Sequence, residues 1–135
     1  MLRAFVMRLY HLGFEVAMQG DMAAPPLGEG DLFLCSAGPG ELSTVTALMG
    51  VAQRDGARVL MITAEPEKPS PRAADQLLVI PAQTMARDRG GASSLPMGSL
   101  FEGAMFLVFE VMVLRLDAIL GQTPEAMRAR HTNME

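Results

Sequence analysis

The chain has 135 residues, enough for one domain with a sizeable core and too few for two. Half of the residues are hydrophobic and 19% are charged, as in a compact water-soluble domain. The formal net charge is −4 and the eleven basic residues are scattered, so we do not expect nucleic acid to be a main partner.

The N-terminal residues are predicted to form a helix, a short strand and a loop. Apolar residues recur at helical spacing over Leu2–Tyr10, and Gly13 is a favourable helix terminator. Phe14–Met18 follows as a short strand, and Gln19–Gly30, with two adjacent prolines, as a loop. No Ser, Thr, Asp or Asn caps the helix, so we expect that Met1 begins a fragment of a longer protein or is a misassigned start.

A strand, a tight loop and a helix follow one another between Asp31 and Gln53. Leu32–Cys35 is a short apolar run typical of a buried strand, and Ser36–Gly40 is broken by glycine and proline. From about Glu41 the apolar residues return to helical spacing. This order brings free backbone N–H groups and the positive end of a helix to one place, which attracts anions and phosphate above all.

The remaining elements alternate in the same way. Leu100–Leu120 is very apolar, but it holds four ionisable residues, so we interpret it as a buried helix of a soluble protein and expect no membrane contact. In chain order we predict a strand at Arg58–Thr63, a surface loop at Ala64–Pro71, a turn of helix or a bend at Ala73–Asp75 and a strand at Gln76–Ile80. A flexible loop at Ala82–Pro96, a long helix at Gly98–Gly121 and a short helix capped by Thr123 follow.

Apolar strands that alternate with helices predict an α/β fold in a single domain over residues 1–135. Because each strand is hydrophobic on both faces, we expect a three-layer sandwich with a parallel sheet between helices. Ligands of such sheets bind beyond the carboxyl ends of the strands. This geometry places Ser36–Glu41, Thr63–Ser70 and Pro81–Thr84 on one rim, where we expect the functional site.

The residue types argue against some other chemistries. Cys35 is the single cysteine, and inside a predicted strand we expect it to be a small core residue rather than a nucleophile. It can form no intramolecular disulfide, which favours a reducing, cytoplasmic setting. No spacing of His, Cys and Asp resembles a metal site, so we expect no metal.

Two motifs are quite specific: Pro-Met-Gly-Ser-Leu-Phe-Glu at Pro96–Glu102 and Arg-His-Thr-Asn-Met-Glu at Arg130–Glu135. With them the chain resembles the sugar-isomerase (SIS) domain family, and most closely its 6-phospho-3-hexuloisomerase branch, over nearly its whole length. The resemblance is also carried by Arg3–Phe14, Gly30–Leu32, Ile62–Pro66, Ala74–Asp75 and Ile80–Thr84.

The resemblance implies a five-stranded parallel sandwich of the SIS, flavodoxin-like type that acts on a phosphorylated sugar. Members of the family interconvert a 3-keto hexulose 6-phosphate and fructose 6-phosphate through an enediol, without a metal or redox cofactor. They usually act as homodimers or homotetramers whose sites are shared between subunits. Such an isomerisation requires a base that moves a proton between adjacent carbons and a group that assists ring opening.

The resemblance and the rim together suggest site residues. Glu102 matches the base proposed for the family, His131 is the candidate for ring opening, and Arg3 stands where family members place an arginine. Each candidate has a structural alternative: Glu102 as a helix charge favoured by the dipole, His131 as an idle tail residue, and the loop residues as those that a tight turn requires. Substrate-binding candidates on the rim are Ser36, Gly38, Gly40, Ser43, Thr44 and Thr84.

Two differences from the family pattern keep a second function open. The family's Ser-Gly-Ser-Gly-Glu-Thr loop aligns with Ser36–Glu41, where Gly38 replaces a serine, Glu41 replaces a threonine and Pro39 lacks an N–H. The family's preceding helix and Gly-rich strand have no counterpart in this sequence. The alternative is a non-catalytic domain that binds a sugar phosphate as a regulator or sensor.

A sheet without the family's Gly-rich strand exposes an edge and apolar helix faces, so we expect strong self-association or poor stability.

Overall fold

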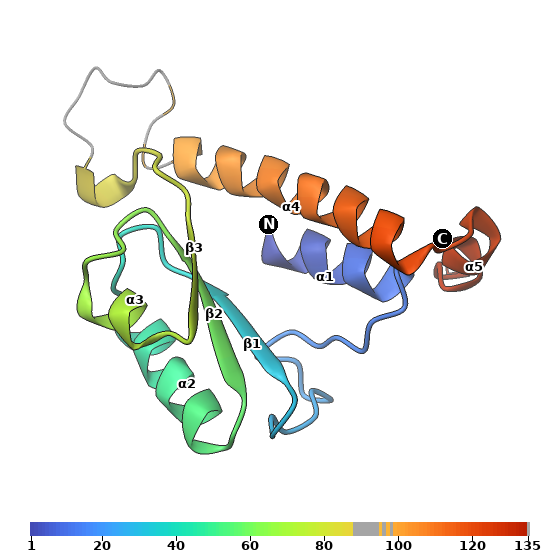
Figure 1. Cartoon of the computed structure of the whole chain (residues 1–135), viewed down its shortest axis with the longest axis horizontal. Coiled ribbons are helices and arrows are strands. Elements are labelled where there is room, and N and C mark those ends of the chain that lie inside the picture. The colour runs from blue at the N-terminus through green and yellow to red at the C-terminus, as the bar shows by residue number, and fades with distance from the viewer. Residues whose placement is uncertain (88–94, 96, 98, 135) are drawn as a thin grey trace. The chain divides into compact units, whose positions relative to one another are not determined.

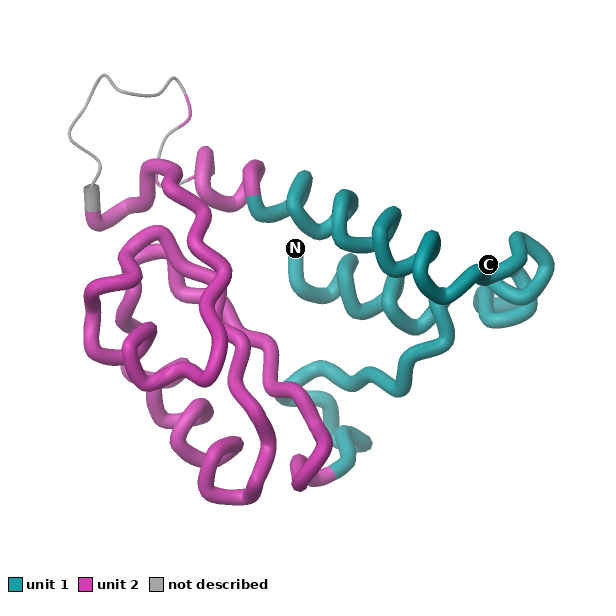
Figure 2. The backbone as a smooth tube through the Cα atoms, viewed as in Figure 1, with its two compact units in different colours: residues 1–25, 105–135 teal, residues 26–104 magenta. Residues whose placement is uncertain are grey.

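The computed structural model describes residues 1–87, 95, 97 and 99–134. The chain forms two compact units (Figure 2): residues 26–104 are the sheet unit, and residues 1–25 with 105–135 are the helical unit. Most of the predicted loop at Ala82–Pro96, together with Gly98 and Glu135 of the two specific motifs, lies outside the described residues.

The sheet unit contains three parallel strands in the order β1-β2-β3 (Figure 1). The strands are β1 (Leu32–Ser36), β2 (Arg58–Thr63) and β3 (Gln76–Val79), and their register places Leu32 opposite Arg58 and Leu60 opposite Gln76. The strands predicted at Leu32–Cys35, Arg58–Thr63 and Gln76–Ile80 are confirmed to within one residue, and so is the parallel α/β class. Three strands occur among the described residues, where the resemblance implies five.

The strands are not equally buried, so the prediction that each is hydrophobic on two covered faces is only partly right. Val59, Met61 and Ile62 of the central strand β2 have no exposed surface. In the edge strand β3, Leu77 and Val79 point to the same face of the sheet and are exposed, so that face is not fully covered there.

Two helices of the sheet unit lie side by side. α2 (Ser43–Arg54) packs on β1 and β2 and buries Met49 and Ala52 in the core. α3 (Pro69–Ala73) adjoins α2, since the Thr46 and Ser70 hydroxyls lie 2.7 Å apart. The prediction of a loop throughout Ala64–Pro71 is therefore wrong at its end: prolines at the start of a helix lose no intrahelical bond and already have a helical φ.

The helical unit contains α1 (Leu2–His11), most of α4 (Ser99–Leu120) and α5 (Pro124–Ala129). These helices are confirmed at nearly the predicted bounds, and the Thr123 hydroxyl accepts the predicted capping bond from the Ala126 N–H at 3.2 Å. The Phe5 and Phe109 rings stack with centroids 4.3 Å apart. A short 3-10 helix, η1 (Met85–Arg87), precedes α4 in the chain.

Two predictions for this unit are wrong. Phe14–Met18 forms no strand, because its backbone pairs with no neighbouring strand and instead leads from α1 into turns. The helix α4 is not buried throughout, since Leu107, Leu114 and Ile119 are largely exposed. Among the described residues, none of the helices combines the length and apolarity that a membrane span requires.

Candidate functional site

The loops beyond the three strands meet in the sheet unit, as the rim prediction requires. The Ala64 N–H donates to the Gly38 carbonyl at 3.2 Å, and the Ile80 N–H donates to the Thr63 carbonyl at 2.9 Å. The Thr63 hydroxyl accepts from the Glu65 N–H at 3.0 Å. The first bond fixes the loop after β1 against the loop after β2, the second holds the end of β3 beside β2, and the third shapes the loop after β2.

Two glycines of the first loop are enclosed by side chains. A Cβ on Gly40 would lie 2.7 Å from Lys68 Cγ and 2.9 Å from the Glu65 carbonyl oxygen, and Gly40 also has a φ of +85°. A Cβ on Gly38 would lie 3.0 Å from a ring carbon of Phe101 and 3.1 Å from the Thr84 methyl. Packing and the positive φ therefore require glycine at position 40, whereas an alanine at position 38 would make Phe101 and Thr84 shift by a few tenths of an ångström.

The loop ends at the N-terminus of α2, which has no side-chain cap. The helix begins at Ser43, two residues later than predicted, and Leu42 stands at the capping position, where it offers no acceptor. Within the described part of the chain no side chain bonds to the first N–H groups of α2, which carry the positive end of the helix dipole. Ser43 and Thr44 are exposed at this end, whereas Ser36 closes β1 and is half-buried.

Thr84 is the rim candidate whose hydroxyl forms no hydrogen bond within the described part of the chain. Its side chain is buried, and among the described residues its hydroxyl has no hydrogen-bond partner. Leaving a buried hydroxyl unpaired costs about 1–3 kcal/mol. A polar group of a ligand that reached this hydroxyl would recover that cost.

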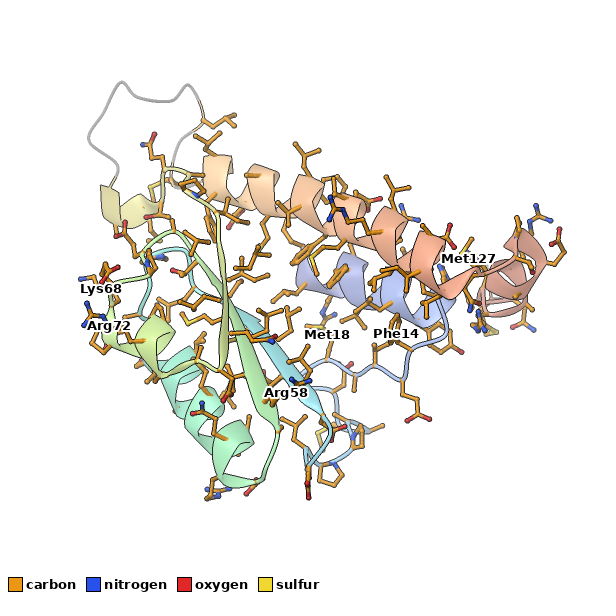
Figure 3. All side chains as sticks on the ribbon, in the orientation of Figure 1. Phe14, Met18, Arg58, Lys68, Arg72 and Met127 are labelled. Atoms are coloured by element: carbon orange, nitrogen blue, oxygen red, sulfur yellow. The ribbon has the colours of Figure 1, made fainter. Side chains whose placement is uncertain are left out.

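Lys68 is a rim residue that the sequence reasoning missed. Its aliphatic stem lies over Gly40, its side chain is exposed, and it forms no ion pair within the described part of the chain. Arg72, one turn later, is instead paired with Glu67 at 2.6 Å; Figure 3 shows Lys68 and Arg72 at the same end of the sheet unit. Since Thr63–Ser70 was already placed on the rim, a search of that loop for cations would have found Lys68.

Glu102 lies in the first turn of α4 and belongs to the sheet unit. Phe101 is buried against Gly38 and so anchors the start of the helix to the rim. The Glu102 side chain follows it and is exposed, in contrast to the buried helix that the sequence predicts. Among the described residues it forms no hydrogen bond or ion pair, so its carboxylate is free to meet a substrate.

His131 and Arg3 belong to the helical unit. The His131 ring stacks on His11 with centroids 5.2 Å apart. Arg130 holds this end of the chain, because its Nη1 donates at 2.9 Å both to the His11 carbonyl and to Gln122 Oε1. Arg3 is exposed on α1 and has no ion pair among the described residues.

A pocket of about 430 Å³ adjoins His131 within the helical unit. Its lining mixes charges of both signs: Arg8, His11, Glu110, Asp117, Arg128 and His131. Arg8 and Glu110 form an ion pair across it at 3.5 Å. Leu12, Leu114 and Met127 also line the pocket, so His131 lies among both apolar and ionisable side chains.

Cys35 is a core residue, as predicted. It packs beside Met49 and Met61, and burial raises the pKa of its thiol to about 11. A thiol with such a pKa is a poor nucleophile near neutral pH. Clusters of three or more His, Cys, Asp or Glu side chains that could hold a metal are absent from the part of the chain that the structure describes.

Known proteins resemble the chain in sequence and in fold. It is 32% identical over 136 residues to the 3-hexulose-6-phosphate isomerase of Bacillus subtilis (strain 168), with 100% of this chain and 74% of the relative covered. The enzyme of that name from Methylomonas aminofaciens is 35% identical, with 98% and 73% covered. A crystal structure from Methanococcus jannaschii, for which a molecular function of 3-hexulose-6-phosphate isomerase was inferred, matches with a TM-score of 0.86 at 23% identity, covering 98% of this chain and 71% of the other. No family model matches the chain.

Proposed function

Because the chain belongs to the 3-hexulose-6-phosphate isomerase family of SIS domains, we propose that it interconverts a 3-keto hexulose 6-phosphate and fructose 6-phosphate. The observation that carries this proposal is identity above 30% to enzymes of that name over the full length of the chain. The geometry of the rim supports it, because an uncapped helix end, a free lysine and an unpaired threonine hydroxyl gather in one place.

The phosphate of the sugar binds at the N-terminus of α2 in this proposal. Free N–H groups there accept an anion, and the exposed hydroxyls of Ser43 and Thr44 add donors. Lys68 supplies a positive charge beside Gly40, which offsets the negative charge of Glu41 at the same loop. Lys68 thereby compensates in part for the hydroxyls that the family loop carries and this loop lacks.

The chemistry is a proton transfer between adjacent carbons. Glu102 removes the proton from C3 of open-chain fructose 6-phosphate while the carbonyl oxygen at C2 gains a proton, which gives a 2,3-enediol; a proton is then delivered to C2 and the hydroxyl at C3 loses its proton, which leaves the ketone at C3. His131 donates a proton to the ring oxygen while the ring of the sugar opens, in its own site or in that of a neighbouring subunit.

We also propose a cytoplasmic setting and a homo-oligomer for this enzyme.

Replacing Glu102 by Gln tests the proposal. The wild-type chain should form fructose 6-phosphate from 3-hexulose 6-phosphate, and Glu102→Gln should lower kcat by about 10²–10⁴-fold, as the loss of a general base does. Glu125→Gln, at the first turn of α5, is the matched control and should keep the wild-type rate.

Thermal shifts with fructose 6-phosphate separate the alternatives. Stabilisation of both the wild type and Glu102→Gln, with turnover by the wild type alone, supports the isomerase. Stabilisation without turnover by the wild type would instead identify a sugar-phosphate-binding domain. If neither turnover nor stabilisation occurs with the wild type, both functions are wrong.

A further inference from the structure

Two consecutive residues after α5 contact the same residue of α1. Arg130 Nη1 donates to the His11 carbonyl at 2.9 Å, and the His131 ring stacks on the His11 ring, with centroids 5.2 Å apart and planes inclined by 24°. The Arg130 guanidinium also lies against Gly13, where a Cβ would be 3.0 Å from Nη2. His11 is thus the residue through which the segment that carries His131 is attached to α1.

A backbone contact determines which nitrogen of His131 carries a hydrogen. Its Nδ1 lies 3.0 Å from the Thr132 carbonyl oxygen. A carbonyl oxygen only accepts hydrogen bonds, so Nδ1 must be the donor in this contact. Neutral His131 then has its lone pair on Nε2, and Nε2 gains or loses a proton while the bond from Nδ1 stays in place. Nε2 is therefore the atom that exchanges a proton with a substrate.

The stack on His11 restricts the rotation of the His131 ring. His131 is exposed and follows the last helix of the chain, so solvent by itself would leave its ring free to turn. His11 is half-buried in the last turn of α1, and its ring covers one face of the His131 ring. Flat rings in contact prefer defined relative orientations. The stack and the bond from Nδ1 together hold the imidazole in one orientation, which proton transfer requires.

We propose that His11 is a positioning residue for the opening of the sugar ring: it orients the His131 imidazole so that Nε2 is presented to the ring oxygen. The Nε2–H of the imidazolium gives its proton to O5 of fructose 6-phosphate, and the C2–O5 bond breaks with its electron pair on O5. The C2 hydroxyl releases its proton to water and becomes the ketone, and solvent reprotonates Nε2. This inference rests on the proposed function, in which His131 opens the ring, and adds the residue that orients it.

Exchange between the two ring anomers of fructose 6-phosphate measures ring opening directly, because the anomers interconvert only through the open chain. Exchange NMR should show that the wild type accelerates this interconversion. His11→Ala should lower the acceleration about tenfold or more, since a misplaced catalytic group loses rate steeply. His11→Phe keeps a flat ring for the stack and should retain most of the acceleration. Met7→Ala, which removes an exposed side chain one turn earlier on α1, is the matched control and should retain all of it.

The isomerase assay is scored separately, so the two proposals fail in different ways. A wild type that forms fructose 6-phosphate from 3-hexulose 6-phosphate but does not accelerate anomer exchange overturns the role of His11 and leaves the isomerase standing. Anomer exchange at the wild-type rate in His11→Ala also overturns it, and so does an equal loss in His11→Ala and His11→Phe. A wild type that accelerates the exchange without forming fructose 6-phosphate contradicts the isomerase instead, and the loss in His11→Ala with rescue in His11→Phe then still supports the role of His11.

Nitrogen NMR tests the orientation of the imidazole without any turnover. The chain has two histidines, so His11→Ala leaves the signals of His131 alone. At about pH 8, where an ordinary histidine is neutral, His131 of the wild type should carry its hydrogen on Nδ1. In His11→Ala the signals should shift toward a mixture of both tautomers. A hydrogen on Nε2 in the wild type, or identical His131 signals in the wild type and in His11→Ala, would overturn the proposal.

Discussion

The sheet unit buries large apolar residues, whereas the helical unit leaves several of them exposed. In the sheet unit Val59 and Met61 have no exposed surface, because they pack in one core with Met49 and Ala52 of α2. In the helical unit Leu107 and Leu114 of α4 are 65% and 70% exposed. Apolar residues thus close a core in the first unit, whereas in the second several of them lie exposed on a helix.

This difference separates two contributions to the folded state. The rim that carries the candidate site is fixed by packing and hydrogen bonds within the sheet unit, so its geometry depends on one chain. The helical unit buries Phe5 and Phe109 but leaves Leu107 and Leu114 exposed, so in the homo-oligomer that we propose part of its stability would depend on association. Substitutions in the two units should therefore differ in whether protein concentration changes their effect.

Met61→Ala should have the largest effect on stability. Met61 is fully buried in β2, and removing such a side chain costs about 2–5 kcal/mol of unfolding free energy. Leu107→Ala, on the exposed face of α4, should cost about 0.5 kcal/mol or less at dilutions where the chain is monomeric. Urea unfolding at two protein concentrations measures both, and equal losses at low concentration would contradict the contrast between the units.

Gly40→Ala should be the next most damaging change. The φ of +85° and the contacts with Lys68 and Glu65 both oppose a methyl group, and the strained backbone alone costs about 1–3 kcal/mol. Gly50→Ala is the matched control within the same unit, because Gly50 lies inside α2 with open space around it; the alanine should stabilise the chain by about 0.4–1 kcal/mol. Thermal unfolding of both variants distinguishes a required glycine from a tolerated one.

Arg130→Ala should have a smaller effect, confined to the helical unit. Its Nη1 bonds to the His11 carbonyl and to Gln122 keep the residues after α5 against α1, and their loss should cost about 1 kcal/mol. Arg128→Ala removes only an exposed contact 3.9 Å from Glu125 and should change little. Faster proteolysis near His131 in Arg130→Ala alone is the expected readout, and equal cleavage of both variants would contradict it.

Asp75 should give the sheet unit a modest dependence on acid. Its carboxylate accepts the Val59 N–H at 2.8 Å, which together with Gln53 holds the pKa of Asp75 below its usual value. A lowered folded-state pKa stabilises the chain above about pH 4, and that stability is lost as the pH falls through the folded-state pKa. Asp75→Asn should flatten this part of the stability curve, measured by urea unfolding from pH 6 to pH 3, and an unchanged slope would show that the bond contributes nothing.

The strands and the rim were accessible to sequence reasoning because they depend on local signals. Short apolar runs such as Arg58–Thr63, bounded by glycine and proline, identify the strands, and parallel strands must place their following loops at one edge. The Phe14–Met18 strand failed because an apolar run does not reveal whether a pairing partner exists. The exposure of α4 was missed because a helix that is apolar on two sides shows no single preferred face.

The residues of the candidate site were less accessible. Gly40 was found as part of a turn, yet its need for a bare backbone arises from Lys68, which lies far from it in sequence. The unpaired hydroxyl of Thr84 likewise depends on what packs around it. Whether a position must be glycine, and whether a hydroxyl finds a hydrogen-bond partner, depends on tertiary contacts. The spacing of apolar residues in the sequence does not reveal these contacts.

Deuterium exchange into fructose 6-phosphate is the most direct test of the proposed isomerisation. The chain and the sugar are incubated in D₂O, and proton NMR follows the C3 hydrogen, which the 2,3-enediol gives up to the base. The wild type should replace this hydrogen by deuterium and leave the C1 hydrogens intact, while Glu102→Gln should lose the exchange. Retention of the C3 hydrogen with the wild type, or equal exchange by the wild type and Glu102→Gln, would contradict the assignment of Glu102 as the base of an enediol isomerase.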